Sequence, residues 1–399
     1  MRVVFNASTA VGDKTGVGRY TAELLRCLQA QMQPEELVVY PHNWVRKLRG
    51  RWKSSTAPRP PSQSGNRSRS WIPSPRQSVA SVLRPIGHGL LRLYDRVALR
   101  QNGFDLYHEP NFIPMACKLP TAITFHDLSV VTHPEWHPGY RVAMFEKHLP
   151  RALEQSVHFF TVTEFVRREM IERLHIPHEK ITCTYNGNRP DFVPMDEEQF
   201  RPALQRLGMP NNYLLHLGTI EPRKNLLRLM QAYVDLPAEL RERCPLVLAG
   251  QWGWRFDETA DFFFSTARHR GVIQTGFVPD ADLPAVYNGA RALVFPSLYE
   301  GFGIPAIEMM GCGGAVLAST AGALAEVVGK QAALIEPQDV EGWRDAMKRV
   351  ITDDQWWQGL KKGVVERAGQ FTWERTATET LRVYQRLAGV EPRQLPKAA

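Results

Sequence analysis

The stretch Glu300-Gly301-Phe302-Gly303-Ile304-Pro305-Ala306-Ile307-Glu308 contains two acids and two glycines where a buried strand is followed by a helix. The strand is expected at Ala292–Phe295, where four apolar residues follow one another. The helix is expected to begin near Pro305, because proline suits the first turn of a helix. Gly301 and Gly303 have no side chain to cover the backbone, so their N–H groups can face a ligand beside the helix start.

The two acids of this stretch differ in their expected positions. Glu300 should lie in the loop and Glu308 on the first helical turns. Two carboxylates with free access to hydroxyl groups suit recognition of a sugar and a ribose. A purely structural role for Glu308, as an acid stabilised by the helix dipole, is the alternative, but it leaves the two glycines without a reason.

Outward from this stretch, short apolar and β-branched runs alternate with longer helical patterns, which is typical of βαβ units. In the first half, strands are expected at Val3–Asn6, Leu37–Tyr40, Leu106–Tyr107, Ala122–Phe125, Phe160–Val162 and Ile181–Thr184. In the second half, they are expected at Leu214–Leu217, Leu246–Ala249, Val272–Thr275, Ala292–Phe295, Ala315–Ala318 and Ala333–Ile335. The two series predict an α/β protein of two doubly wound domains, residues 1–190 and 195–370, that face each other across a cleft.

Two further segments concern the connection between these domains. The weakest secondary-structure pattern lies around Asn188–Pro202, and the hinge is expected there. A last helix is expected to begin at Thr372-Trp373-Glu374 and to run to about Leu387, within a segment 371–389. Leu381 and Tyr384 are its candidate packing residues.

A second chemical motif ends the first strand of the second domain, in Leu217-Gly218-Thr219-Ile220-Glu221-Pro222-Arg223-Lys224-Asn225. Gly218 at the strand end and Arg223 and Lys224 on the following turn lie where doubly wound sheets bind ligands. Arginine can bind a diphosphate with two N–H groups, and lysine adds a point charge. An exposed basic turn is the alternative, but the position at the carboxyl end of the strand favours a diphosphate site.

A third, weaker motif follows the first strand of the chain. Gly16-Val17-Gly18-Arg19-Tyr20 opens a helix expected to reach about Met32, and the start of a helix favours an anion. The segment lacks a complete GxGxxG pattern, and a simple tight turn would use the same residues.

Together with His126-Asp127 after a strand, these motifs resemble the family-4 retaining glycosyltransferases of the GT-B fold, which has two Rossmann-like domains. The resemblance covers nearly the whole chain except residues 54–78, and it is nearest to bacterial mannosyltransferases and rhamnosyltransferases of polysaccharide assembly. Where many relatives have Ser before Glu-Phe, this chain has Thr163-Glu164-Phe165, which keeps the hydroxyl.

The resemblance implies a role for each motif residue. Arg223 and Lys224 would neutralise the donor diphosphate, and Glu308 would accept hydrogen bonds from the ribose. Glu300 and the backbone of Phe302 and Gly303 would hold the donor sugar. His126 would lie near that sugar at the cleft, Gly16 and Gly218 would lie by the donor, and the last helix would cross back to the first domain.

The resemblance also implies the reaction: transfer of a hexose, with retention, from a nucleotide-diphosphate sugar, the donor substrate, to a glycan acceptor. GDP-mannose is the expected donor, and a rhamnosyl-, glucosyl- or GlcNAc-transferase using a dTDP- or UDP-sugar is the alternative. A sugar-nucleotide epimerase is a further alternative, whereas a phosphorylase would need a pyridoxal-phosphate lysine and a much longer chain.

Neither a metal nor another cofactor is expected. Asp280-Ala281-Asp282 spells the acidic pair of metal-dependent glycosyltransferases, but it precedes an apolar helical pattern, so helix capping is the preferred interpretation. His133 and His137 could line the acceptor side or lie in a solvated loop. The five scattered cysteines form no CxxC pair, which excludes a disulfide framework and favours a reduced, cytoplasmic setting.

The positive charge is concentrated between Pro41 and Arg100, where 13 Lys and Arg residues face one Asp, a net charge of +12. Residues 54–78, rich in Ser, Pro and Arg, are expected to form a mobile insertion, followed by a helix at Val79–Arg100. A basic block suggests an anionic partner. The interpretation preferred here is a peripheral protein on the inner face of the cell membrane with a lipid-diphosphate-linked glycan as acceptor. A solvated basic helix is the plainer alternative, and nucleic-acid binding is disfavoured because no recognisable module is present.

Overall fold

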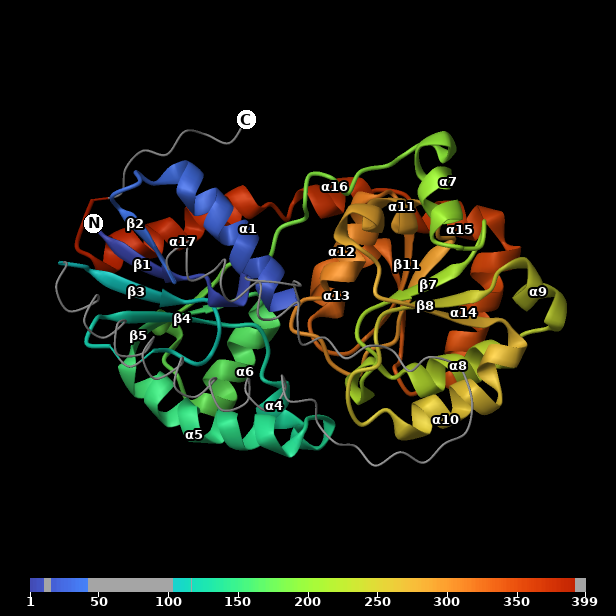
Figure 1. The fold of residues 1–399 in the computed structure, drawn as a ribbon, viewed down its shortest axis with the longest axis horizontal. Helices are drawn as coiled ribbons and strands as arrows, with labels where there is room; N and C mark the ends of the chain where they lie inside the picture. Colours follow the sequence, from blue (N-terminus) through green and yellow to red (C-terminus); the bar gives the residue numbers. More distant parts are fainter. Residues whose placement is uncertain (11–15, 42–102, 116, 392–399) are drawn as a thin grey trace, which may run out of the picture.

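The computed structural model describes residues 1–10, 16–41, 103–115 and 117–391. The chain forms two lobes, each built around a parallel sheet with helices on both faces (Figure 1). The expected insertion at 54–78 and the expected helix at Val79–Arg100 lie outside the described residues.

The first sheet has the strand order β2-β1-β3-β4-β5-β6, with every pair parallel. Its strands are β1 (Val3–Asn6), β2 (Leu37–Tyr40), β3 (Leu106–Glu109), β4 (Thr121–Phe125), β5 (Ser156–Thr161) and β6 (Ile181–Cys183). The apolar runs predicted from the sequence form these strands because helices cover both faces and leave the side chains without water.

The second sheet has the order β12-β11-β10-β7-β8-β9, again with every pair parallel. Its strands are β7 (Leu214–Leu217), β8 (Leu246–Ala249), β9 (Val272–Gly276), β10 (Ala292–Phe295), β11 (Ala315–Ser319) and β12 (Ala333–Ile335). The strand order reverses between β7 and β10, so the loops after these two strands open at the point where doubly wound sheets bind ligands.

Helices cover each sheet on two sides (Figure 1). Those of the first domain are α1 (Gly16–Gln31), α4 (Ser129–Thr132), α5 (Gly139–Gln155) and α6 (Glu164–Leu174). Those that follow are α7 (Glu197–Arg206), α8 (Leu226–Val234), α9 (Ala238–Arg243), α10 (Asp257–Ser265), α11 (Leu283–Asn288), α12 (Ile304–Gly311), α13 (Leu324–Val328), α14 (Val340–Thr352), α15 (Asp354–Leu360), α16 (Val364–Gly369) and α17 (Trp373–Leu387). One continuous apolar core includes buried residues of α1 and α17 in the first domain and of α11 and α12 in the second, so the two lobes share packing.

The last helix returns to the first domain, as predicted from the sequence. The Thr372 side chain accepts a hydrogen bond from the Arg375 amide at the start of α17, which is a favourable N-cap. Leu381 and Tyr384 are buried, and α17 packs along α1 (Figure 1).

The chain passes between the domains twice, near Asn188 and near Thr372, and these two segments lie side by side. Asn188 and Thr372 form a parallel bridge, and a Cβ at Gly187 would lie 2.2 Å from the Trp373 nitrogen. Only a residue without a side chain permits so close an approach. The hinge predicted at Asn188–Pro202 is wrong at its end, because Pro202 lies inside α7.

Candidate functional site

The loops after β7 and β10 are joined to each other at the carboxyl edge of the second sheet. The first contains a short 3-10 helix, η4 (Pro222–Lys224). The Leu298 amide donates to the Arg223 carbonyl at 2.8 Å, and the Asn225 side-chain amide donates to the Pro296 carbonyl at 3.1 Å. These contacts bring the two motifs predicted from the sequence into one site.

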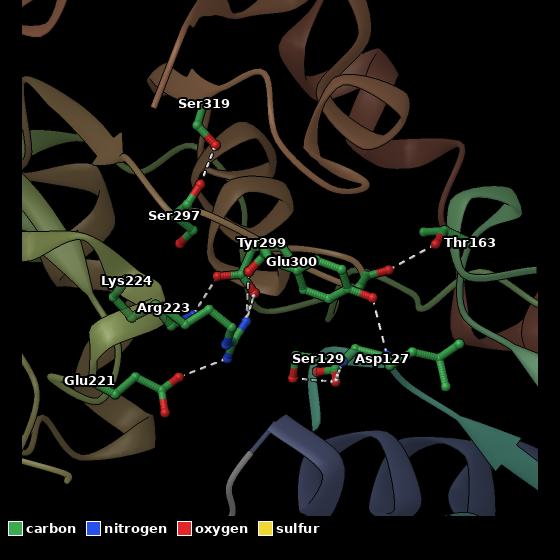
Figure 2. A network of polar contacts seen from close by, with 12 residues as sticks. Asp127, Ser129, Thr163, Glu221, Arg223, Lys224, Ser297, Tyr299, Glu300 and Ser319 are labelled. Carbon is green, nitrogen blue, oxygen red and sulfur yellow. Dashed lines mark hydrogen bonds and ion pairs between the residues drawn. The ribbon is translucent and has the colours of Figure 1, made fainter. Parts of the chain in front are cut away.

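Within this site, Glu300 forms ion pairs with two cations of its own domain (Figure 2). Arg223 Nη1 lies 2.8 Å from Glu300 Oε2, and Lys224 Nζ lies 2.5 Å from Glu300 Oε1. The other end of the guanidinium, Nη2, donates to Glu221 Oε1 at 2.8 Å. Glu300 and Lys224 are both buried, at 6% and 8% exposure. A buried carboxylate is therefore paired with two positive groups, which is the arrangement that a buried charge requires.

The pKa values of Glu300 and Arg223 follow from their ion pairs. Burial by itself would raise the pKa of Glu300, but Arg223 and Lys224 outweigh burial and lower the pKa to about 2. Burial would lower the pKa of Arg223, whereas Glu300 and Glu221 raise it above its ordinary value. Both groups are therefore charged throughout the physiological range.

The glycines of the Glu300 loop meet different constraints. A Cβ at Gly301 would lie 1.8 Å from the His126 carbonyl oxygen of the first domain, so glycine allows the domains to touch there. Gly303 has φ +99°, a backbone conformation that favours glycine, and it precedes the first residue of α12. Within the described part of the chain, the N–H groups of Phe302 and Gly303 have no hydrogen-bond acceptor. These groups can bind a ligand at the helix start.

Glu308 lies on α12 and is also buried, at 2% exposure. Tyr287 donates a hydrogen bond of 2.8 Å to Oε2, while Arg19 Nη1 of α1 lies 3.4 Å from Oε1. Burial raises the pKa of Glu308, and the charge of Arg19 opposes this rise without cancelling it. The expectation that both acids have free access to ligand hydroxyls differs from the structure, in which protein groups contact each carboxylate.

The residues predicted from the first-domain motifs lie on the other side of the domain boundary from Glu300 and Glu308. Gly16 is the first residue of α1 and is exposed, with open space where a Cβ would lie. The imidazole of His126 follows β4, lies 2.8 Å (Nε2) from the Pro110 carbonyl and packs edge-on against Tyr20. In the second domain, Gly218 directly follows β7 with φ +151°, close to the Lys224 side chain. His126 thus reaches the second domain through its carbonyl, at Gly301.

The helix-capping interpretation of Asp280 and Asp282 is wrong. Asp282 occupies the N-cap position of α11 without a side-chain cap, and Asp280 belongs to a 3-10 turn, η6 (Asp280–Asp282). Instead, Asp280 binds Arg19 at 2.5 Å, and Asp282 binds Arg206. The arginines compete successfully because a charged donor makes a stronger hydrogen bond than a backbone amide.

The two histidines after α4 lie in different surroundings. His133 is partly exposed and stacks on Trp136 with ring centroids 3.9 Å apart. His137 is buried, with Nε2 3.0 Å from the Ser129 hydroxyl, and burial lowers its pKa. The solvated-loop interpretation is therefore wrong for His137.

Several residues at the domain boundary were not predicted as site residues. Arg19 connects α1 with Glu308 and Asp280, and Tyr299 connects the Glu300 loop with the first domain. Arg19 lies inside the motif Gly16–Tyr20, and Tyr299 directly precedes the stretch that begins at Glu300. These positions were the available signal, but the partners are far away in the chain.

No group of three or more His, Cys, Asp or Glu side chains that could hold a metal ion occurs among the described residues. Nor does any helix in those residues combine the length and apolar character needed to cross a membrane.

Two family models match the chain in succession. The Glycosyltransferase Family 4 model matches residues 14–192, and the model for Glycosyl transferases group 1 matches residues 197–368. The sucrose-phosphate synthase structure from Thermosynechococcus elongatus superposes with a TM-score of 0.69 at 20% identity, covering 98% of this chain and 100% of that one. At that identity the likeness concerns the fold. The fold and the site thus define a glycosyltransferase of the GT-B class.

Sequence relatives narrow the class further. O-antigen chain mannosyltransferase B of Escherichia coli is 33% identical over 390 residues, 97% of this chain and 100% of that protein. The serotype-specific mannosyltransferase WbdA of Escherichia coli is 32% identical over 277 residues, 67% of this chain and 33% of that longer protein. The chain belongs to glycosyltransferase family 4, among the bacterial enzymes of polysaccharide biosynthesis. The family and fold predicted from the sequence are confirmed.

Proposed function

We propose that this glycosyltransferase moves mannose from GDP-mannose onto a lipid-diphosphate-linked glycan, with retention of configuration and without a metal or other cofactor. The choice of mannose rests on two Escherichia coli relatives that are named mannosyltransferases. The observation that carries the proposal is the pairing of Arg223 and Lys224 with Glu300 at the edge of the second sheet.

This pairing suits one kind of ligand. Two cations each lie within hydrogen-bond distance of one carboxylate. Cations bind anions and a carboxylate accepts hydrogen bonds from hydroxyl groups, so a matching ligand presents an anion next to hydroxyl groups. A nucleotide-diphosphate sugar has this pattern, with the diphosphate beside the sugar. When the bond between the sugar and the diphosphate breaks, negative charge grows on the leaving phosphate. Arg223 and Lys224 are placed to stabilise that charge, and groups fixed in advance in a buried site do so most effectively.

In this proposal, Glu308 binds the ribose at the other end of the same donor. It follows the N–H groups of Phe302 and Gly303, which have no acceptor among the described residues, by less than two helical turns, and its carboxylate can accept hydrogen bonds from ribose hydroxyls. Arg19 and the nucleotide would then share Glu308. The ribose and phosphate contacts are common to all nucleotide sugars, so they do not select the base.

A panel of nucleotide sugars tests the donor. GDP-mannose should raise the unfolding temperature more than UDP- or dTDP-sugars, because a ligand at about 100 times its dissociation constant adds about 2.7 kcal/mol. Transfer of radiolabelled sugar to membrane lipid extract should follow the same order. Stabilisation and transfer with a dTDP- or UDP-sugar alone would replace mannose with rhamnose, glucose or GlcNAc.

Metal independence is tested with EDTA, which should leave the transfer rate unchanged because two protein cations already face the site of the diphosphate. Strong inhibition, reversed by Mg²⁺ or Mn²⁺, would show that a metal serves the diphosphate instead.

The proposal also places the enzyme at the cytoplasmic face of the membrane. Support comes from the sequence, since residues Pro41 to Arg100 carry a net charge of +12 and each basic residue near an anionic leaflet contributes about 1 kcal/mol. The protein should sediment with phosphatidylglycerol vesicles at low salt and be released as salt rises. Deletion of residues 54–78 should weaken sedimentation. Protein that stays in solution at low salt, or that shifts DNA instead, would contradict membrane attachment.

A further inference from the structure

Tyr299 connects the Glu300 loop of the second domain with the first domain through its side chain. The ring is buried at 4% exposure, although it lies in a loop between two domains. Its hydroxyl accepts a hydrogen bond from the Leu128 amide at 3.1 Å and donates to Glu169 Oε2. Both partners belong to the first domain, on α4's N-terminal side and on α6.

The main chain of the same residue holds Arg223. Arg223 Nη1 donates to the Tyr299 carbonyl at 2.9 Å and to Glu300 Oε2 at 2.8 Å (Figure 2). A guanidinium is planar and its N–H groups point in fixed directions, so these two acceptors, together with Glu221 Oε1 at Nη2, define its orientation. One residue therefore contacts the first domain with its hydroxyl and orients a cation of the site with its carbonyl.

The next residues of the loop contact the first domain as well. The Thr163 hydroxyl at the start of α6 donates to the Gly301 carbonyl at 2.8 Å. Gly301 also approaches the His126 carbonyl too closely for any side chain. The loop from Tyr299 to Gly301 is consequently held against the first domain at three points, with Glu300 in the middle.

The hydroxyl of Tyr299 is suited to this contact. Burial and the nearby carboxylates of Asp127 and Glu169 raise its pKa, so the hydroxyl keeps its proton and can donate it to Glu169. The ring packs edge-on against Phe165, 5.6 Å between centroids, and against His133 at 6.2 Å. Removal of the hydroxyl alone would leave this packing intact and would remove both polar contacts at once.

We propose that Tyr299 is a positioning residue that couples closure of the two domains to the orientation of Arg223 and Glu300. With the hydroxyl docked between Leu128 and Glu169, the 299–301 loop is fixed and both side chains are set for the leaving diphosphate. When the domains separate, the loop loses these anchors and the two side chains lose their orientation. The consequence for transfer rests on the proposed function, whereas the coupling itself can be measured without a donor.

Tyr299→Phe tests the coupling, with Tyr213→Phe as the matched control. Tyr213 is also a buried tyrosine of the second domain, but its hydroxyl donates to the Val286 carbonyl of the same domain. Y299F should lower kcat about tenfold or more, because small displacements of reacting groups cost up to about a hundredfold. The dissociation constant of the donor should change less than about threefold, since the groups proposed to bind it remain. Y213F should leave both quantities unchanged.

Glu169 variants separate positioning from general loss of structure. Glu169→Gln keeps an oxygen that can accept from Tyr299, so it should retain most activity, whereas Glu169→Ala should act like Y299F. The double variant Y299F/E169A should be no worse than Y299F alone, because Y299F already removes the contact with Glu169. A normal kcat in Y299F, or equal losses in Y299F and Y213F, would overturn the proposal.

Hydrogen exchange of the ligand-free protein provides a readout that does not depend on the reaction. The Leu128 amide should exchange faster in Y299F than in the wild type, and Y213F should not change it. Unchanged exchange at Leu128 in Y299F would overturn the coupling even if activity fell. If the wild type transferred no sugar from any nucleotide donor, the proposed function would fail while the exchange result still decided whether Tyr299 joins the domains.

Discussion

Glu300 and Glu308 belong to one short stretch of sequence, yet the structure gives them opposite electrostatic properties. Glu300 is paired with Arg223 and Lys224 of its own domain, and its pKa is lowered to about 2. Glu308 receives a tyrosine hydroxyl from its own domain and an arginine from the other one, and its pKa is raised. Both are buried, so the number and distance of nearby cations decide the outcome.

The different partners of Glu300 and Glu308 indicate different roles for the two ends of the site. Around Glu300, the charges balance within the second domain and are present whatever the first domain does. Around Glu308, the cation at 3.4 Å is Arg19 of α1, so the charge of this carboxylate depends on the contact between the domains. The Glu300 end therefore keeps its charge without the first domain and depends on it, through Tyr299, only for orientation, whereas the Glu308 end depends on the first domain for its charge.

The largest effect is expected on catalysis at the Glu300 end. Lys224→Ala should reduce the transfer rate by about a hundredfold or more, because removing one fixed group that stabilises developing charge costs about this much. Glu308→Ala should also nearly abolish transfer, but mainly through a higher KM for the donor, since its proposed contact is with the ribose.

Lys348→Ala is the control, an exposed lysine on α14. Steady-state kinetics with the matched donor would check both variants. Near-normal turnover in either would show that the site has been assigned to the wrong residues.

Next in size is the effect on stability, which should differ between the two acids. Glu300→Gln leaves Lys224 without its carboxylate partner and Arg223 with Glu221 alone in a buried site, so the free energy of unfolding should fall by about 3 kcal/mol. Glu308→Gln removes one charge that is only partly compensated and keeps an acceptor for Tyr287, so the loss should be about 1 kcal/mol or less. Urea unfolding at pH 7 would measure both, and equal losses would contradict the comparison.

The pH dependence of stability should have opposite signs for the two acids. The contribution of Glu300 is present above the ordinary pKa of Glu and is lost as pH falls from about 4.5 towards 2, since the unfolded chain takes up its proton first. Glu308 keeps its proton longer in the folded state, so its contribution falls as pH rises above the ordinary value. Each slope is at most about 1.4 kcal/mol per pH unit.

Unfolding curves between pH 3.5 and 8, compared as wild type minus E300Q and wild type minus E308Q, isolate the two contributions. Slopes of the same sign would show that Arg19, together with Arg189 at 3.9 Å from Glu308 Oε1, holds Glu308 as firmly charged as Arg223 and Lys224 hold Glu300.

The smallest effect is expected for Arg19→Gln. Removal of this cation should raise the pKa of Glu308 further, so the loss of donor affinity at low pH should begin at a higher pH, by less than about one unit. Arg26→Gln is the control, because Arg26 lies on the same helix but pairs with Glu23 and Glu374. Donor titrations across pH 5 to 8 would measure the shift, and identical curves for R19Q and R26Q would contradict the role of Arg19.

The sequence predicted the strands well because each is a short apolar run buried on both faces. Arg223, Lys224 and Glu300 could be assigned to one edge for a related reason: the loops after parallel strands open on the same side of the sheet. The hinge and the acids Asp280 and Asp282 were harder, because Pro202 is tolerated in α7 and because Arg19 and Arg206 displace the expected helix caps. The pairing of the two acids depends on which residues distant in the chain the fold brings close to them.

The sequence by itself determined the family, the two doubly wound domains and the motif residues that follow the strands, since all of these depend on local patterns. The tertiary structure alone decided the partners across the cleft. Arg19 meets Glu308 over 289 residues of chain, and Tyr299 meets Glu169 over 130. No spacing in the sequence encodes such pairs, because they arise from the way the two domains pack against each other. The pKa values also depend on the tertiary structure, since burial and nearby charges set each of them: charges of its own domain for Glu300, and Arg19 of the first domain for Glu308.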